Sequence, residues 1–341
     1  MSSAALTRRR RTVARRPKSG EFDLIARYFA PLSAGQPGAL GLRDDAALLP
    51  PSPGAVHVLT TDTLISGVHF LPDDPPALVA RKLLRVNISD LAAMAAQPVA
   101  YLLALSLPRE YDESWVEGFA AGLAQDQEDF GIGLLGGDTT ATPGPLSATI
   151  TAIGEVPTGA ELRRSGARPG DMIFVSGTIG DAALGLMVLA GDLSELAEAA
   201  AEDLIGRYCL PRPRVSLGYA LRGRANAAAD VSDGLVADLG HICAASGVGA
   251  RIDYGRLPLS PAVRAAIAAA PETASTVLSG GDDYELLFTC APAAAADISA
   301  AAVRAEVPVT EIGSVVDGNG VTVIGEDGHE INMKSTGYRH F

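Results

Sequence analysis

The chain has 341 residues, 48% of them hydrophobic, and a formal net charge of −13. This length predicts one large or two medium domains, and the hydrophobic fraction excludes a disordered chain. Seven of the 27 basic residues lie in residues 1–20, which contain no acid, so all 40 acidic residues belong to the remainder. So acidic a body should repel nucleic acid and anionic membranes; we expect neither as a partner, and phosphate groups should be bound through metal ions.

The basic segment 1–20 is expected to be a disordered, solvated leader. No apolar h-region follows it, so it does not resemble a secretion signal, and no run of 18 apolar residues indicates a membrane span. The three cysteines, Cys209, Cys243 and Cys290, are scattered without metal or redox spacing. This cysteine usage predicts a cytoplasmic protein.

Residues 21–30 are predicted to form the first helix, with Phe22 on its apolar stripe. A loop follows, and a short apolar strand is expected at residues 46–49. Asp44 and Asp45 come directly before this strand. Paired acids of this kind are usually a polar turn, so on their own they do not indicate a site.

The stretch 56–70, VHVLTTDTLISGVHF, begins as a β-branched, apolar strand. It is expected to end at Thr60, Thr61 and Asp62, which place hydroxyl and carboxylate oxygens at the tip of a strand. Oxygens of this hard type on a rigid element are the ligands that Mg²⁺ prefers. Taken alone, the same residues favour a solvated turn over a metal site, because a single motif match is weak evidence.

Proline residues at 75 and 76 begin a long helix that is expected to reach about residue 96. Asn87 and Asp90 are three residues apart and therefore share a face of this helix. A buried carboxylate needs a partner, so Asp90 could be either a metal ligand or a satisfied core acid. A strand at 99–107 and a helix at 114–130 follow, and both are most simply core elements.

The sequence GIGLLGGDTT after this helix matches the pattern G-x-G-x-x-G at Gly131, Gly133 and Gly136. A dinucleotide site is rejected, because these glycines follow a helix, a strand runs through them, and TTATPGP cannot open the required second helix. The remaining interpretation is a strand that ends at Gly137 and Asp138, where glycine lets the backbone approach a ligand closely.

A domain boundary is expected at residues 157–159, after a strand at 146–156. In the second half, Gly177 and Gly180 lead into a helix whose N-terminus could bind an anion, although ordinary strand-to-helix punctuation is favoured. A strand at 227–231 ends in DVSDGL, where Ser232 or Asp233 is placed to cap the next helix. Further strands are expected at 248–252, after the GGDD stretch at 280–283, at 309–315 and at 321–325, with a helix at 292–305.

The chemistry of interest lies in acids that mostly follow strands, beside Gly, Ser or Thr. They are Asp45, Asp62, Asp90, Asp138, Asp230 and Asp233. The chain has neither the P-loop pattern G-x-x-x-x-G-K-[ST] nor the protein-kinase motifs, and it has only three lysines. Carboxylates without lysine suit several magnesium ions that carry a polyphosphate, and such a site can transfer a phosphoryl group without a covalent intermediate.

Seven motifs now carry a resemblance. They are RDDAALL, TTDTLISGVHF, VNISDLAAMAA, LLGGDTT, RSGARPGD, DVSDGL and GGDDYELLF, in this order, over about residues 20–338. The set resembles thiamine-monophosphate kinase, a family of the aminoimidazole-ribonucleotide synthetase superfamily. The resemblance implies a cytoplasmic homodimer that transfers the γ-phosphoryl group of ATP directly to thiamine monophosphate, giving thiamine diphosphate and ADP.

The same resemblance implies an α/β (α+β) two-domain fold. Residues 21–156 would form an ATP- and magnesium-binding domain, with a mixed sheet and helices, that pairs its sheet across the dimer. Residues 157–341 would form a C-terminal α/β domain. The implied cofactors are several Mg²⁺ ions, with ATP as co-substrate.

Site residues are carried over position by position. Those that resemble the family's magnesium positions are Asp45, Thr60, Thr61, Asp62, Asp90, Asp138, Asp230 and Asp233. Those that resemble its ATP contacts are Gly137, Asp138, Arg164 and Ser232. Those that resemble its thiamine-phosphate contacts are His69, Asp282 and Tyr338. No general base is identifiable, so no catalytic residue is assigned.

Two departures from the family pattern stand out: Arg43 replaces the usual Gly before the acid pair, and Asp282 stands where Glu is common. A selenophosphate synthetase is disfavoured, because the first cysteine of the chain is Cys209. Two alternatives remain open. One is another ATP-dependent enzyme of the superfamily, such as aminoimidazole-ribonucleotide synthetase, and the other is a nucleotide- and metal-binding regulator without turnover.

Overall fold

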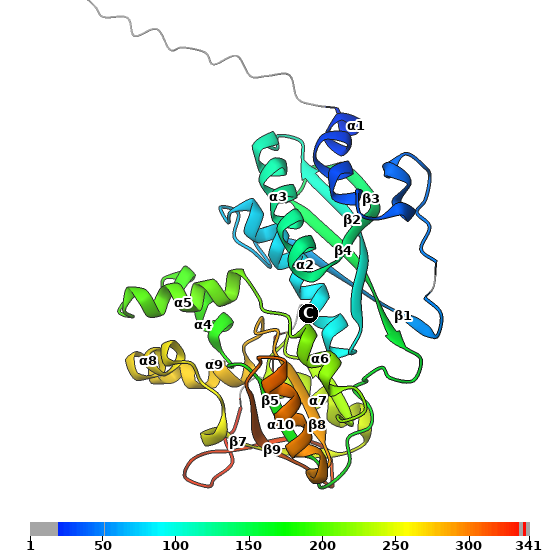
Figure 1. The fold of residues 1–341 in the computed structure, drawn as a ribbon. Coiled ribbons are helices and arrows are strands. Elements are labelled where there is room, and N and C mark those ends of the chain that lie inside the picture. Colours follow the sequence, from blue (N-terminus) through cyan, green and yellow to red (C-terminus); the bar gives the residue numbers. More distant parts are fainter. Residues whose placement is uncertain (1–19, 51, 334–336, 339–341) are drawn as a thin grey trace, which may run out of the picture.

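The computed structural model describes residues 20–50, 52–333 and 337–338. Two sheets, each with its own helices, form the upper and lower parts of the molecule in Figure 1, and α2 (Pro76–Ala93) runs from one part to the other. Within the described residues, no helix combines the length and the apolar character needed to cross a membrane.

The upper sheet has four strands in the order β1-β4-β2-β3. Its strands are β1 (Ala55–Ile65), β2 (Gln97–Pro108), β3 (Gly133–Thr142) and β4 (Ser147–Pro157). The pair β2/β3 is parallel and is joined by the crossover helix α3 (Glu113–Phe130), whereas β4 is antiparallel to both β1 and β2. Helices α2 and α3 cover one face, where Leu83, Phe119, Tyr101 and Ile150 are fully buried in one core.

The other face of this sheet is largely open. A segment that follows α1 (Glu21–Leu24) covers one end of it through Ala39 and Leu49. Elsewhere on this face, however, Leu59 of β1 is 65% exposed and Leu102 of β2 is 38% exposed. Large apolar side chains that are left in solvent on a sheet face mark a surface that another molecule could cover.

Three local expectations for this part are wrong. The predicted strand at 46–49 is irregular, and the Leu48 N–H donates to the carbonyl of Gly38 at 2.8 Å. Phe22 does not join an apolar stripe, because it is 81% exposed while Leu24 is the buried residue of α1. Neither β1 nor β3 ends at its acid: both strands continue past Asp62 and Asp138, because their neighbours pair with them along their full length.

The lower sheet has six strands in the order β10-β7-β9-β5-β8-β6. These are β5 (Met172–Ser176), β6 (Ala227–Asp230), β7 (Gly249–Asp253), β8 (Leu286–Cys290), β9 (Val309–Val316) and β10 (Gly320–Ile324). The helices are α4 (Asp181–Ala190), α5 (Glu198–Cys209), α6 (Val215–Leu221), α7 (Leu235–Ser246), α8 (Pro261–Ala269), α9 (Ala274–Ser279) and α10 (Ala295–Arg304). The predicted strands and the predicted C-terminal helix of this half are all present, with ends shifted by at most three residues.

Helix α2 is locked into the lower part of the molecule by backbone contacts. A Cβ added at Gly218 of α6 would lie 2.3 Å from the carbonyl oxygen of Ala92, so α6 and the end of α2 touch backbone to backbone. Arg85 Nη1 donates to the carbonyl of Pro211, in the connection between α5 and α6, at 2.8 Å. The two parts of the molecule therefore share α2 as a common core element.

Candidate functional site

A cavity of about 700 Å³ lies between the two parts of the molecule. Its walls come from β1 with the loop that follows it, from α4, from the loops before α7 and β8, and from residues 337 and 338. Seven of the predicted site residues line it, namely Thr61, Asp62, His69, Ser232, Asp233, Asp282 and Tyr338. Residues that are up to 277 positions apart in the sequence are thus brought to one surface.

Asp62 and Asp90 form the centre of an acidic cluster at this cavity. Asp62 points from β1 toward α2, where its carboxyl group is in hydrogen-bond contact with that of Asp90. The Thr60 hydroxyl, two residues earlier on the same side of β1, donates to Asp90 Oδ2 at 2.5 Å. Burial, together with the nearby charges of Asp90 and Asp233, raises the pKa of Asp62 to about 7.

Asp230 extends the cluster from the end of β6. Its carboxylate accepts a hydrogen bond from the Ser89 hydroxyl of α2 at 2.7 Å and is almost fully buried. Burial, and then the charges of Asp90, Asp238 and Asp62, raise its pKa well above the usual range. Burial likewise raises the pKa of Asp90, against the opposing effects of Thr60 and Arg164.

Like charges held this close are unstable unless protons or cations neutralise them. The donor set consists of carboxylate and hydroxyl oxygens, the hard ligands that Mg²⁺ takes, and Asp90 contacts both Thr60 and Asp62 within it. The residues present therefore fit a divalent cation, and a phosphate chain carried by one.

The expected cap of α7 is wrong in a way that favours the site. Neither Ser232 nor Asp233 caps the helix; instead Asp238, inside its first turn, accepts hydrogen bonds from the backbone N–H groups of Ser232, Asp233 and Gly234 at 3.0 to 3.1 Å. Because Asp238 satisfies these donors, the side chains of Ser232 and Asp233 are left to face the cavity.

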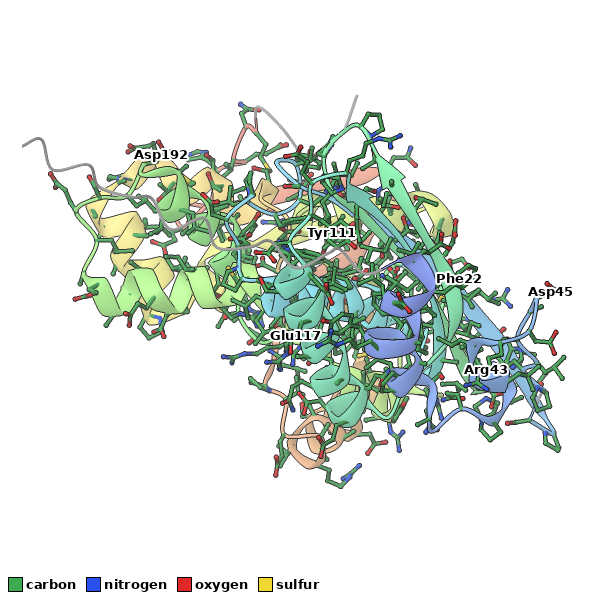
Figure 2. All side chains as sticks on the ribbon, turned by 90° about the horizontal axis from the view of Figure 1, so that it is seen from above. Phe22, Arg43, Asp45, Tyr111, Glu117 and Asp192 are labelled. Carbon is green, nitrogen blue, oxygen red and sulfur yellow. The ribbon has the colours of Figure 1, made fainter. Side chains whose placement is uncertain are left out.

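A second cavity, of about 540 Å³, holds three more of the predicted residues. Asp45, Gly137 and Asp138 line it, and it shares no lining residue with the first cavity. Figure 2 shows Arg43 and Asp45 on a loop at the periphery of the molecule. The predicted magnesium positions are thus divided between two places in one chain, and a single convergent cluster is not what the structure shows.

Sheet topology explains the division. Asp138 pairs with Ala104, Ala104 with Thr149, and Thr149 with Thr63, so Asp138 and the neighbour of Asp62 lie in one row at opposite edges of the sheet. Strands are about 4.8 Å apart, so three steps separate the edges by about 14 Å. Arg164 is on the side of Asp62, because its charge lowers the pKa of Asp90.

Sequence reasoning missed a lysine beside the first cavity, whose partners Asp282 and His69 line that cavity. Lys82 of α2 is 3% exposed, and Nζ donates to Asp282 Oδ2 at 2.9 Å. A lysine within the apolar run of a helix that packs in the core was the available signal, because such a side chain needs a partner.

The proposed anion-binding N-terminus of α4 is occupied by the protein itself. The carboxylate of Asp283 accepts from the backbone N–H groups of Gly180 at 2.7 Å and Ala182 at 3.3 Å. The sequence-based preference for a structural role at these glycines therefore holds, and the loop that carries Asp282 is anchored to α4.

The raised pKa of Asp62 predicts a pH-dependent stability. The pKa of an aspartic acid in an unfolded chain is 3.8 and that of Asp62 in the folded chain is about 7, so this carboxyl contributes stability that is fully present below about pH 4. That contribution is lost as the pH rises through about 7. In EDTA, the melting temperature should therefore fall between pH 5 and pH 8 by more in the wild type than in Asp62→Asn. Added Mg²⁺ should raise it more at pH 8 than at pH 6; equal slopes in the two proteins would contradict the assignment.

Comparisons with known proteins agree with this geometry. The model of the family described as AIR synthase related protein, N-terminal domain, matches residues 43–156, and that of its C-terminal domain matches residues 168–326. A thiamine-monophosphate kinase from Caulobacter vibrioides is 47% identical over 323 residues, which are 94% of this chain and 90% of that protein.

Solved structures give the same result. The thiamine-monophosphate kinase from Stenotrophomonas maltophilia superposes with a TM-score of 0.77 and 46% identity, covering 85% of this chain and 91% of that one. A structure described as AaThiL complexed with AMPPCP and TMP superposes with a TM-score of 0.76 and 34% identity, covering 94% and 97%. The predicted α/β two-domain superfamily fold is thereby confirmed.

Proposed function

The chain belongs to the thiamine-monophosphate kinase family, and from this premise we propose that it transfers the γ-phosphoryl group of ATP to thiamine monophosphate in a Mg²⁺-dependent reaction. The products are thiamine diphosphate and ADP. The observation that supports this most directly is the cluster of Asp62, Asp90 and Asp230, whose pKa values are all raised, each chiefly by burial.

We propose that Thr60, Thr61, Asp62, Asp90, Asp230 and Asp233 hold the Mg²⁺ ions of the first cavity. Bound there, Mg²⁺ would neutralise the phosphates and the charge that develops during transfer. The residues of the chain would position the metal ions: β1 and α2 are rigid elements, and they fix the direction in which the ligand oxygens point. No side chain is assigned as a base, because phosphoryl transfer depends mainly on positioning and charge stabilisation.

The same cavity has lining residues outside the acidic cluster. His69, Asp282 and Tyr338 line it, and Met187 and Tyr284 contribute apolar and aromatic surface suited to a heterocycle. We propose that these residues bind the organic part of thiamine monophosphate, so that its phosphate points toward Asp62. For ATP we propose contacts with Gly137, Asp138, Arg164 and Ser232.

Two copies of the chain are proposed to pair through the open face of the upper sheet. The exposed Leu59 and Leu102 on this face would be covered by a second copy. Pairing also offers a way to reunite the divided ligands, because Asp45 and Asp138 of one copy could reach the Asp62 edge of the other. On this proposal residues 21–156 are the ATP- and magnesium-binding domain and residues 157–341 the C-terminal α/β domain.

If each site combines residues from both copies, a mixed dimer of two inactive variants should be active. Asp62→Asn and Asp138→Asn should each be nearly inactive as homodimers. A mixed dimer would contain one doubly altered site and one intact site, so it should recover roughly half of the wild-type activity per dimer. Co-expression with two different affinity tags isolates the mixed dimer, and light scattering checks its mass. If each site lies within one chain, the mixed dimer should stay as inactive as its parents.

A cytoplasmic location is also proposed. Cys209, Cys243 and Cys290 are all described and are free thiols. Thiols persist in a reducing compartment, and ATP is available there.

A product assay tests the proposed function. The purified chain is incubated with ATP and thiamine monophosphate, with and without Mg²⁺, and thiamine diphosphate is separated by chromatography. The expected result is stoichiometric formation of thiamine diphosphate and ADP only when Mg²⁺ is present. Turnover of formylglycinamidine ribonucleotide instead would reassign the chain within the superfamily, and binding of both substrates without turnover would make it a regulator.

A further inference from the structure

Lys82 contacts both walls of the first cavity from inside α2. Its Nζ donates to Asp282 Oδ2 at 2.9 Å and to the backbone carbonyl of His69 at 3.3 Å. The same nitrogen lies 3.6 Å from the centroid of the Tyr208 ring. A carboxylate, a carbonyl oxygen and an aromatic face thus surround the ammonium group, which accounts for its burial.

On one wall, Lys82 completes the fixation of Asp282. Tyr284 donates its hydroxyl to the other carboxylate oxygen, Oδ1, at 3.2 Å, so both oxygens of Asp282 have partners. The backbone of this loop adopts left-handed conformations, with φ of +71° at Asp282 and +50° at Tyr284. Such conformations are strained for residues other than glycine and persist only where surrounding contacts hold them.

On the opposite wall, Lys82 and Tyr208 both donate hydrogen bonds to the backbone carbonyl of His69. The Tyr208 hydroxyl donates to the same His69 carbonyl, at 3.2 Å. The ring Nδ1 of His69 accepts the Ile65 N–H at 3.1 Å, so the neutral ring carries its proton on Nε2. The loop of the upper part that carries His69 and the loop of the lower part that carries Asp282 are therefore tied through one amine.

Folding stability does not explain this arrangement. Replacing a buried ion pair by apolar side chains of similar volume is often neutral for stability, because the desolvation of the charges offsets their attraction. Asp282 is moreover 32% exposed, so water could solvate its carboxylate without Lys82. What the ammonium group does supply is a fixed geometry between His69 and Asp282.

We infer that Lys82 is a positioning residue for the thiamine monophosphate site: it sets the relative placement of His69 and Asp282, which the organic part of the substrate contacts. This inference rests on the proposed function. It requires that Lys82 affects binding of thiamine monophosphate and has little effect on ATP, because Lys82 contacts His69, Asp282 and Tyr208, none of which is a proposed ATP contact.

Lys82→Met is the decisive variant, because methionine fills the volume and removes the charge and the donors. The KM for thiamine monophosphate should rise by about tenfold to a hundredfold, the range for displaced substrate-positioning groups. The KM for ATP and the melting temperature should stay near the wild-type values. Arg81→Gln is the matched control. Arg81 is the neighbour of Lys82 in α2, and its replacement also removes an ion pair, but that pair is with Asp126 of α3. The KM of this variant for thiamine monophosphate should therefore not change.

Two further variants separate positioning from a general effect of charge. Lys82→Arg keeps the charge and the donors, so it should recover part of the affinity. In an Asp282→Asn background, Lys82→Met should have a clearly smaller effect than in the wild type, because the two residues act through one contact. Equal effects in both backgrounds, or parallel increases of both KM values, would overturn the inference.

Readouts without turnover keep this test separate from the proposed function. Calorimetric titration with thiamine monophosphate in the absence of ATP should show the same loss of affinity in Lys82→Met. If wild-type protein does not form thiamine diphosphate, the proposed function fails, whereas the inference is still decided by a crystal structure of Lys82→Met. Unchanged positions of Asp282 and of the His69 carbonyl in that structure would refute it.

Discussion

Asp62→Asn is expected to lower kcat for thiamine diphosphate formation by roughly a thousandfold or more, as for the loss of one charge-stabilising group in a phosphoryl-transfer site. Asparagine keeps the shape of the side chain and one acceptor oxygen, but it removes the negative charge that a divalent cation needs. The same change removes the buried charge, and with it the burial cost and the repulsion that together raise the pKa of Asp62 to about 7. Metal-free Asp62→Asn should therefore melt at a higher temperature than the wild type, as is common when a strained active site is neutralised.

The opposite signs of these two effects make the experiment sharp. Single-turnover assays at saturating Mg²⁺ measure the chemical step, and scanning calorimetry in EDTA measures stability. Asp192→Asn is the matched control, because Asp192 is exposed and lies at the far end of the molecule from Asp45 in Figure 2. Asp62 would have to be removed from the proposed metal site if Asp62→Asn retained wild-type activity.

Glu285→Gln is expected to destabilise the fold by about 3–5 kcal/mol, the usual effect of removing one partner from a buried ion pair. Glu285 is fully buried and accepts from Arg207 Nη2 at 2.8 Å and from Arg214 Nε at 2.6 Å. The Ser176 hydroxyl donates to the same carboxylate at 2.5 Å. Glutamine would leave two guanidinium groups facing a neutral amide. The N–H₂ group of that amide would point at one of these donors, so no hydrogen bond could form there.

Urea unfolding followed by circular dichroism measures this loss. Glu311→Gln is the control: Glu311 pairs with Arg256 at 2.8 Å, but the side chains of the pair are 30% and 45% exposed. A solvated pair of this kind contributes about 0–1 kcal/mol, so the control should unfold near the wild-type midpoint. Similar midpoints for the two variants would show that Glu285 contributes no more to folding stability than the exposed Glu311.

The sequence predicted the types of residue in the site better than their places on the strands. Thr60 and Asp62 were expected at a strand tip, yet β1 continues to Ile65 because β4 pairs with it to the end. Strand ends depend on the length of the partner strand, which local residues do not encode. The grouping of these two side chains does not depend on where the strand ends, because alternation along the strand places Thr60 and Asp62 on the same side, toward Asp90.

The division of the acids between two cavities could not be predicted from the sequence. Asp62 and Asp138 looked equivalent, each placed beside small or hydroxyl residues in an extended stretch. Only the strand order puts their strands at opposite edges of the sheet. Lys82 was overlooked for a related reason: its partners His69 and Asp282 come from loops 13 and 200 residues away.

The backbone contact between Gly218 and Ala92 bears on how substrates enter and leave. With α2 embedded in both parts of the molecule, a hinge motion would have to break a glycine-mediated packing contact that has no side chain to rearrange. Catalytic cycles that open whole domains, with release limited by that opening, do not suit such an architecture. Traffic through the cleft must then rely on adjustments of short surface loops, and turnover should respond more to changes in those loops than to solvent viscosity acting on large-scale motions.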